Sequence, residues 1–406
     1  MTLALSTPIL AQDTERQTRS VLTIKTSDTL VGAGMLLSLD PSTPLPQLEP
    51  NEHFVLELGS DGKIAASTGI GLDGWLDATI HPAPLMELFE DQIEDQRQAI
   101  ESTGAMVSPQ LGLSAEDFAA LMDDVFAFPR QIATVELRLS ANPQSDLKNL
   151  EADIVIHPTG DSWLANVLAT MRQHPDGHPV LPSSVDSLLS MSVAMDSRAM
   201  VATSEPFMDF LAKIGSGSEE EGARNRSILA KMLDSMDGTA HSAIDPFSGS
   251  VVGITGLHGG ESMAAVLQSS DYANYIQSYA SLNLSADTKF IARGAEHRDV
   301  ILTKQTVTMQ GIEQTSYIGV AGDYYISAST LDEAKELIDA VLDQRITRRK
   351  LPDDSLMTLD LKLMELLDYA SPVGNPLAGL GDMAPEDVHL SVESKNSTMT
   401  IRIRLK

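Results

Sequence analysis

The sequence predicts an α+β protein in which antiparallel sheets carry helices on one face. Three observations lead to this prediction. Predicted strands outnumber predicted helices and follow one another across short turns, which favours antiparallel pairing. Most of these strands alternate apolar and polar residues, as a sheet with one buried face requires. One order of elements, strand–helix–helix–hairpin–helix, recurs along the chain.

The recurring unit opens with an alternating strand. Three segments fit this description: 76–81, 191–196 and 357–362. The helices expected after the first and third strands share the tetrapeptide Leu-Met-Glu-Leu, at 85–88 and 363–366. In the second copy we expect a helix over 207–214, because Ser204 is a good N-cap and Gly215 a good terminator.

Each unit continues into a strand pair. The expected pairs are 134–140 with 152–157, 240–245 with 251–257, and 388–394 with 398–405. In the first two copies a second helix precedes the pair, over 118–126 and 228–236, and a third follows it. In that third helix, 164–168 matches 263–267 at an offset of 99 residues. We therefore expect two full copies that superpose, and a shortened third copy that ends at its strand pair.

Two β-rich stretches flank these units. In the first, a hairpin pairs 53–58 with 63–67 around Gly62, and in the second, over 287–328, several strands precede a helix that Thr330 caps. We expect two domains after an N-terminal targeting segment. The predicted boundaries are 1–12 for that segment, 13–180 for the N-terminal domain with copy one, and 181–406 for the C-terminal domain with copies two and three.

Composition excludes several classes of protein. The chain has 57 acidic and 28 basic residues, a net charge of −29, which argues against binding to nucleic acid or to an anionic membrane surface. It has no cysteine, so disulfides, thiol nucleophiles and Cys-type zinc sites are excluded. No stretch of about 18 uninterrupted apolar residues predicts a transmembrane helix. Aromatic residues make up 4% of the chain and there are 18 Met, so the core should be aliphatic and filled with Met.

The N-terminal residues resemble the end of a secretory signal. Residues 3–11 are apolar and small, and the step from Ala11 to Gln12 resembles a cleavage site, although no basic residue precedes Arg16. We expect a signal peptide truncated by a start codon placed too late; the alternative is a frayed N-terminus. The predicted compartment is therefore periplasmic or extracellular.

Several motifs that are typical of binding or catalytic sites have a simpler structural interpretation here. Gly69, Gly71 and Gly74 fit a dinucleotide-binding pattern, but a strand follows instead of a helix, so we expect a turn. His258 with the two glycines after it resembles an oxyanion loop, yet no G-x-S-x-G elbow accompanies it, and a strand-to-helix turn is expected. The acidic residues over 87–101 are expected to form a solvated helix face. A basic run is expected to be a solvated helix end, or alternatively a small patch that binds an anion or a partner: Arg345, Arg348, Arg349 and Lys350.

Two sets of side chains remain as candidates for chemistry. The candidates for a hydrolytic site assembled from copy-one residues are His81, Asp77, His157 and Asp161. The candidates for a copper or zinc site are His174, His178 and Met171. The second set falls in a Pro/Gly-rich loop with loose spacing and lacks a further ligand, so an interdomain linker is the preferred interpretation.

The sequence shows no convincing set of a nucleophile with a neighbouring general base. Copies two and three place Asp196 and Lys362 where copy one has His81, so folding of the unit does not require that histidine. Repetition of a sheet-and-helix unit creates extended surfaces, which suit binding. We expect an exported, non-catalytic binding or interaction protein without a cofactor, whose partner is a protein, a peptide or a lipid, with lipid or peptide preferred. The alternatives are a periplasmic hydrolase and a metal-handling protein.

Overall fold

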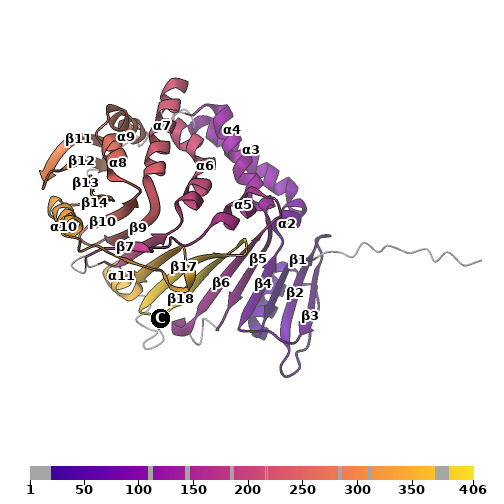
Figure 1. Cartoon of the computed structure of the whole chain (residues 1–406). Coiled ribbons are helices and arrows are strands. Elements are labelled where there is room, and N and C mark those ends of the chain that lie inside the picture. The colour runs from indigo at the N-terminus through magenta and orange to yellow at the C-terminus, as the bar shows by residue number, and fades with distance from the viewer. Residues whose placement is uncertain are drawn as a thin grey trace, which may run out of the picture.

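The computed structural model describes residues 20–107, 113–141, 147–182, 187–214, 216, 218–281, 286–309, 312–370 and 384–406. Over these residues the chain is α+β, with one sixteen-stranded antiparallel sheet and a second sheet of two strands (Figure 1). The predicted fold class and the antiparallel pairing are confirmed. The predicted signal segment, 1–12, lies outside the described residues.

The large sheet does not follow chain order, because strands from the end of the chain occupy its middle. Read across, the strands are β11 (Ala286–His297), β12 (Val300–Met309), β13 (Ile312–Ala321), β14 (Tyr324–Ala328), β10 (Ser250–Leu257), β9 (Met236–Asp245), β8 (Leu189–Ala194), β16 (Met357–Lys362), β17 (Asp387–Lys395), β18 (Thr398–Leu405), β6 (Glu151–Pro158), β5 (Ile132–Leu139), β4 (Leu76–Ile80), β1 (Ser20–Thr26), β2 (His53–Gly59) and β3 (Ile64–Gly69).

Helices join many of these strands and lie over the sheet (Figure 1). They are α1 (Thr29–Leu39), α2 (Pro82–Leu88), α3 (Glu90–Val107), α4 (Ala115–Ala127), α5 (Trp163–Thr170), α6 (Ser197–Lys213), α7 (Glu219–Ser235), α8 (Gly260–Leu267), α9 (Ser270–Ser281), α10 (Leu331–Leu342) and α11 (Leu363–Ala370). The predicted capping box of α10 is present, because Thr330 and Glu333 exchange hydrogen bonds at its start.

Helix α6 begins earlier than predicted. Asp196 is its N-cap, and the Asp196 side chain accepts a hydrogen bond from the Arg198 backbone N–H. The Ser204 hydroxyl donates to the Met200 carbonyl inside the helix, so Ser204 is not a cap. The sequence prediction was wrong here because a Ser before a Pro satisfies local capping rules whether or not a helix already precedes it.

Helices cover both faces of the sheet at one end, where the sequence predicted one covered face. Neighbouring residues of a strand point to opposite faces. On β14, Tyr325 packs against the cluster under α7, α8 and α9, whereas Ile326 belongs to the cluster that α10 closes with Leu337 and Ile338. This end therefore has two tightly packed cores, one on each face.

The middle of the sheet is packed less tightly. Six apolar side chains lie directly opposite one another on successive strands and are all only half-buried: Leu137, Ile154, Ile401, Val392, Met357 and Val193. We call this row the apolar strip. Helix α5 packs near one end of these strands, where Leu164 and Leu168 contact Val135, Ile156 and Met399. The side chains of the apolar strip are thus less buried than those of the core beside α10.

Because the two regions differ in packing, a Leu→Ala substitution should lower the free energy of unfolding more in the core beside α10 than in the apolar strip. Leu337 is 1% exposed, so Leu337→Ala should lower the free energy of unfolding by about 3 kcal/mol through lost burial and a cavity. Leu137→Ala should cost about 1 kcal/mol, because that side chain is already partly in water. Urea unfolding followed by circular dichroism measures both. Equal losses would contradict the loose packing of the apolar strip.

Candidate functional site

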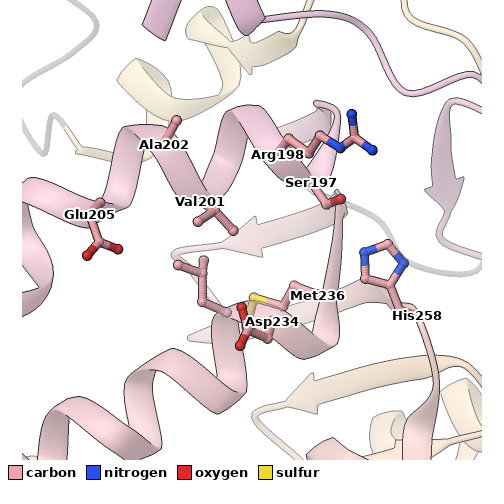
Figure 2. A pocket seen from close by; sticks show the side chains of 9 residues that line it. Ser197, Arg198, Val201, Ala202, Glu205, Asp234, Met236 and His258 are labelled. Carbon is pink, nitrogen blue, oxygen red and sulfur yellow. The ribbon is translucent and has the colours of Figure 1, made fainter. Parts of the chain in front are cut away.

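A cleft of about 570 Å³ opens between α6, the end of α7 and the residue that follows β10 (Figure 2). We call it the α6–α7 cleft. Its lining residues are Ser197, Arg198, Val201, Ala202, Glu205, Leu233, Asp234, Met236 and His258. The five residues from α6 follow helical spacing and form one face of that helix. Figure 2 shows Val201 pointing across the opening toward Met236.

The lining combines apolar and polar side chains. Val201, Ala202, Leu233 and Met236 supply the apolar part, contributed by α6, α7 and the start of β9. Exposed polar side chains stand around it: Arg198, Glu205, Asp234 and His258. Glu205 forms an ion pair with Arg226, at 2.9 Å between Nη2 and Oε1.

Three of these polar side chains have no partner among the described residues. Within the described part of the chain, the side chains of Arg198, Asp234 and His258 form no hydrogen bond and no ion pair. Their charged and polar atoms are therefore available to a ligand, without a protein contact that must first be broken. Chemically, the arrangement can hold an apolar group against α6 and α7 and an anionic group beside Arg198 and His258.

A neighbouring depression of about 500 Å³ shares Asp234 and His258 with the cleft. It adds Lys231 from α7 and residues at the start of α8, among them Glu261 and Ser262. The segment after β10 is a strand-to-helix turn, as predicted. Its glycine at 260 is required by a close approach, because a Cβ there would lie 2.1 Å from the Gly322 carbonyl oxygen.

The structure brings two of the four hydrolase candidates close to one residue. The Nδ1 atom of His81 lies 3.3 Å from the Thr134 hydroxyl, and Thr134 lies directly opposite His157 in the β5–β6 ladder. His157 Nε2 lies 3.2 Å from Glu136 Oε1, without the alignment of a hydrogen bond. The alternation of β5 puts Thr134 and Glu136 on one face, a signal that the sequence analysis did not use.

The other two hydrolase candidates stand apart from this pair of histidines in their contacts. Asp77 is on β4, and its Oδ1 atom is buried without a hydrogen-bond partner in the described part of the chain. Asp161 lies in the turn before α5, with a φ of 60°. None of the four candidates lines the α6–α7 cleft or the depression beside it.

The three metal candidates lie in different surroundings. Met171 packs in the cluster of Ile132, Leu164 and Leu168. His174 accepts a hydrogen bond from the Asp176 backbone N–H at 3.3 Å. His178 is 5% exposed and lies on a short strand, β7 (His178–Val180), which pairs with β15 (Thr347–Arg349) where the sequence predicted a loop. The described residues contain no group of three or more His, Asp or Glu side chains placed to hold a metal ion.

His178 instead contacts a histidine that the sequence analysis did not single out. Its ring meets the ring of His241, on β9, edge to face, with centroids 5.3 Å apart. His241 Nδ1 accepts from the Leu181 backbone N–H at 3.1 Å. Burial, and secondarily the charge on His178, lowers the pKa of His241 to about 4. Burial also lowers the pKa of His178.

The basic run has a structural role at one position. Arg348 Nη2 forms an ion pair with Oδ2 of buried Asp237 at 2.5 Å, and Arg348 Nη1 donates to the Gly177 carbonyl at 3.3 Å. Its guanidinium also lies 5.8 Å from the centre of the Tyr324 ring. The predicted solvated helix end is wrong for Arg348, because pairing of β15 with β7 holds this segment against the large sheet.

Comparisons with known proteins find little. No family model matches the chain, and no curated protein matches it. Three solved structures, of crystal forms IV, III and I of TP0453, are similar to part of it. Their TM-scores are 0.26, 0.25 and 0.22, with identities of 10%, 12% and 11%. The matches cover 52% to 53% of this chain and 72% to 76% of TP0453. Similarity at this level carries no inference about function.

Across the described ranges, no helix is both long enough and apolar enough to cross a bilayer.

The pair formed by buried His178 and half-buried His241 predicts how stability depends on pH. Folding disfavours protonated His241, so its contribution is complete above the unfolded pKa of 6.5 and is lost as the pH falls toward about 4. That interval corresponds to about 3 kcal/mol in the free energy of unfolding. His241→Gln, which keeps a hydrogen-bond acceptor, should reduce the loss of stability between pH 7 and pH 4 by about this amount. Urea unfolding across that range measures it, with exposed His258→Gln as the control. Parallel pH profiles for wild type and His241→Gln would contradict the assignment.

Proposed function

We propose that this chain is an exported, non-catalytic binding protein, and that its ligand is an amphipathic lipid or peptide held in the α6–α7 cleft. The observation that carries the proposal is the meeting of an apolar surface, Val201 with Leu233 and Met236, with the side chains of Arg198 and His258, which have no partner among the described residues. A carboxylate or phosphate would lie beside Arg198, and an acyl chain or apolar side chain would cover Val201.

Binding is favoured over hydrolysis by the surroundings of the polar groups. In the described part of the cleft no hydroxyl is hydrogen-bonded to a base, as an activated nucleophile requires. His81 and His157 flank Thr134 on a different part of the sheet, outside the cleft. A hydrolase with a site at those histidines and a metal-handling protein remain the alternative functions.

We propose that the chain is built from a repeated unit. Two strand pairings support this idea. The opening strands of copies two and three, β8 and β16, pair with Ser192 directly opposite Thr358, the second residue of each predicted motif. The last strands of copies three and one, β18 and β6, pair with Ile401 opposite Ile154. Both pairings are those expected of copies related by local two-fold axes. The division into domains at residue 180 stays a prediction.

The cleft predicts binding of a fluorescent fatty acid, cis-parinaric acid, with its carboxylate at Arg198. Val201→Asp should weaken this binding by about tenfold or more, because it places a charge where the acyl chain would lie. Arg198→Gln should weaken it by about threefold to tenfold through loss of a charged hydrogen bond. Fluorescence titration measures the dissociation constants.

The controls make equivalent changes elsewhere. Val251→Asp is at an exposed position on β10, and Arg293→Gln is at an exposed position on β11; both should leave binding unchanged. Unchanged binding in the two cleft variants would place the ligand elsewhere. Turnover of ester or peptide substrates by the wild type, lost in folded His81→Ala or His157→Ala, would favour the hydrolase instead.

Export is tested in the source cell. The proposal is supported by the small apolar residues at 3–11 and by a chain without cysteine. The chromosomally encoded protein should be found outside the cytoplasm with Gln12 as its first residue. Cell fractionation and N-terminal sequencing check this. A cytoplasmic protein that retains residues 3–11 would refute export.

A further inference from the structure

A second surface, away from the α6–α7 cleft, is formed by the helices of copy one. Figure 1 shows α3 and α4 side by side at the outer edge of the helix layer. The main contacts of α3 are with α4 and α2, and α4 has no fully buried residue. The sequence predicted one solvated acidic helix over this region; the chain instead breaks at Phe89, the C-cap of α2, and α3 begins directly after it.

This pair of helices exposes apolar side chains that an ordinary helix would bury. Val125 is 53% exposed and Ile100 is 41% exposed. The apolar residues of α4 recur at helical spacing, which is the pattern of a helix that packs against a core. Among the described residues, α4 packs mainly against α3 and the turn over 128–131, and no side chain of this stripe is fully buried.

A groove of about 280 Å³ runs between α2, α3 and α4. Met86, Ile93, Phe126 and Ala127 provide its apolar part. Its remaining lining residues are Glu87, Glu90, Glu94, Asp123, Arg97 and Arg130. The groove is small, so it fits individual apolar side chains rather than an acyl chain or a folded domain. We call it the acidic groove.

The lining of the acidic groove has four acidic and two basic residues, a net charge of −2, and the two helices beside it are more acidic. Helices α3 and α4 together carry nine acidic residues and one basic residue, Arg97, a net charge of −8. Arg97 is already occupied, since it contacts Glu101 at 2.9 Å and Asp123 at 2.8 Å. Glu87 and Glu90 form no ion pair or hydrogen bond within the described residues. Unpaired carboxylates beside half-exposed apolar side chains complement a basic segment that also presents apolar side chains.

We propose that the acidic groove docks a basic, amphipathic segment of a partner protein. Apolar side chains at helical spacing would enter between Ile93 and Phe126, and Lys or Arg side chains would meet Glu87 and Glu90. An anionic membrane surface is disfavoured as the occupant, because the same carboxylates repel it. The proposal does not rest on the α6–α7 cleft, which lies on other helices.

The test uses a fluorescently labelled synthetic peptide of Leu and Lys, about 18 residues long, with Leu at helical spacing. A scrambled peptide of the same composition has the same charge but no apolar stripe. By fluorescence anisotropy, the patterned peptide should bind the full chain at least about tenfold more tightly than the scrambled one. Equal binding of the two peptides would overturn the proposal, because it would reduce the interaction to net charge.

Two pairs of variants locate the binding. Glu90→Gln with Glu94→Gln should weaken binding by about tenfold, and the matched control Glu219→Gln with Glu220→Gln, at the start of α7, by less than about twofold. Phe126→Ala should weaken binding by a similar factor, whereas Phe207→Ala, which removes an exposed ring from α6, should not. Circular dichroism verifies that each variant is folded.

The results distinguish docking of a basic peptide from binding by net charge alone and from binding of lipid. Equal weakening by the test and control variants would overturn the proposal, as would binding that none of them changes. Failure of the patterned peptide to bind would overturn it too, and binding to zwitterionic phosphatidylcholine vesicles that Phe126→Ala abolishes would then assign the groove to lipid. None of these results depends on the fatty-acid titration, since no variant here lines the α6–α7 cleft.

Discussion

Two antiparallel ladders, β8 with β16 and β18 with β6, hold the sixteen strands in one sheet. The strands between them come from the end of the chain, so the sheet is continuous only when residues about 170 positions apart, in β8 and β16, and about 250 positions apart, in β6 and β18, have paired. Arg402 reinforces one of these ladders: from β18 it contacts Asp153 on β6 at 2.8 Å and Glu393 on β17 at 3.0 Å. Without this meander, β8 and β6 would each present an unpaired edge.

The same antiparallel order assembles the α6–α7 cleft. In neighbouring antiparallel strands, the end of one and the start of the next lie at the same edge of the sheet. Helix α6 starts just after β8 ends, α7 ends where β9 starts, and His258 directly follows β10. Arg198, Asp234 and His258 therefore meet at one edge, although 60 positions separate the first from the last. The cleft is a consequence of strand order more than of any local motif.

Local patterns predicted what depends on local interactions. The alternation over 53–67 and the cap at Thr330 identified a hairpin and a helix correctly, because turn residues and capping side chains act within a few positions. The pairing of β7 with β15 was missed, since it joins residues about 170 positions apart and each strand has only three residues. The contact between His241 and His178 was missed for the same reason, because it joins residues 63 positions apart on different strands.

The candidate sites also differ in how far the sequence could predict them. His81 and His157 were selected from one copy, and the sheet register does bring them to the two sides of Thr134. No spacing in the sequence indicated that Val201, Leu233 and Met236 would face a common space beside Arg198. Such surfaces emerge only from the way helices are placed over a sheet, and a single sequence contains no direct record of that placement.

Ligand binding in the α6–α7 cleft can be measured by native mass spectrometry of the protein purified from its own host. The wild-type protein should carry an amphipathic molecule that is released on unfolding, and a folded Val201→Asp protein from the same cells should lack it. A wild-type protein without any bound molecule, or an identical bound molecule in wild type and variant, would contradict ligand binding in this cleft.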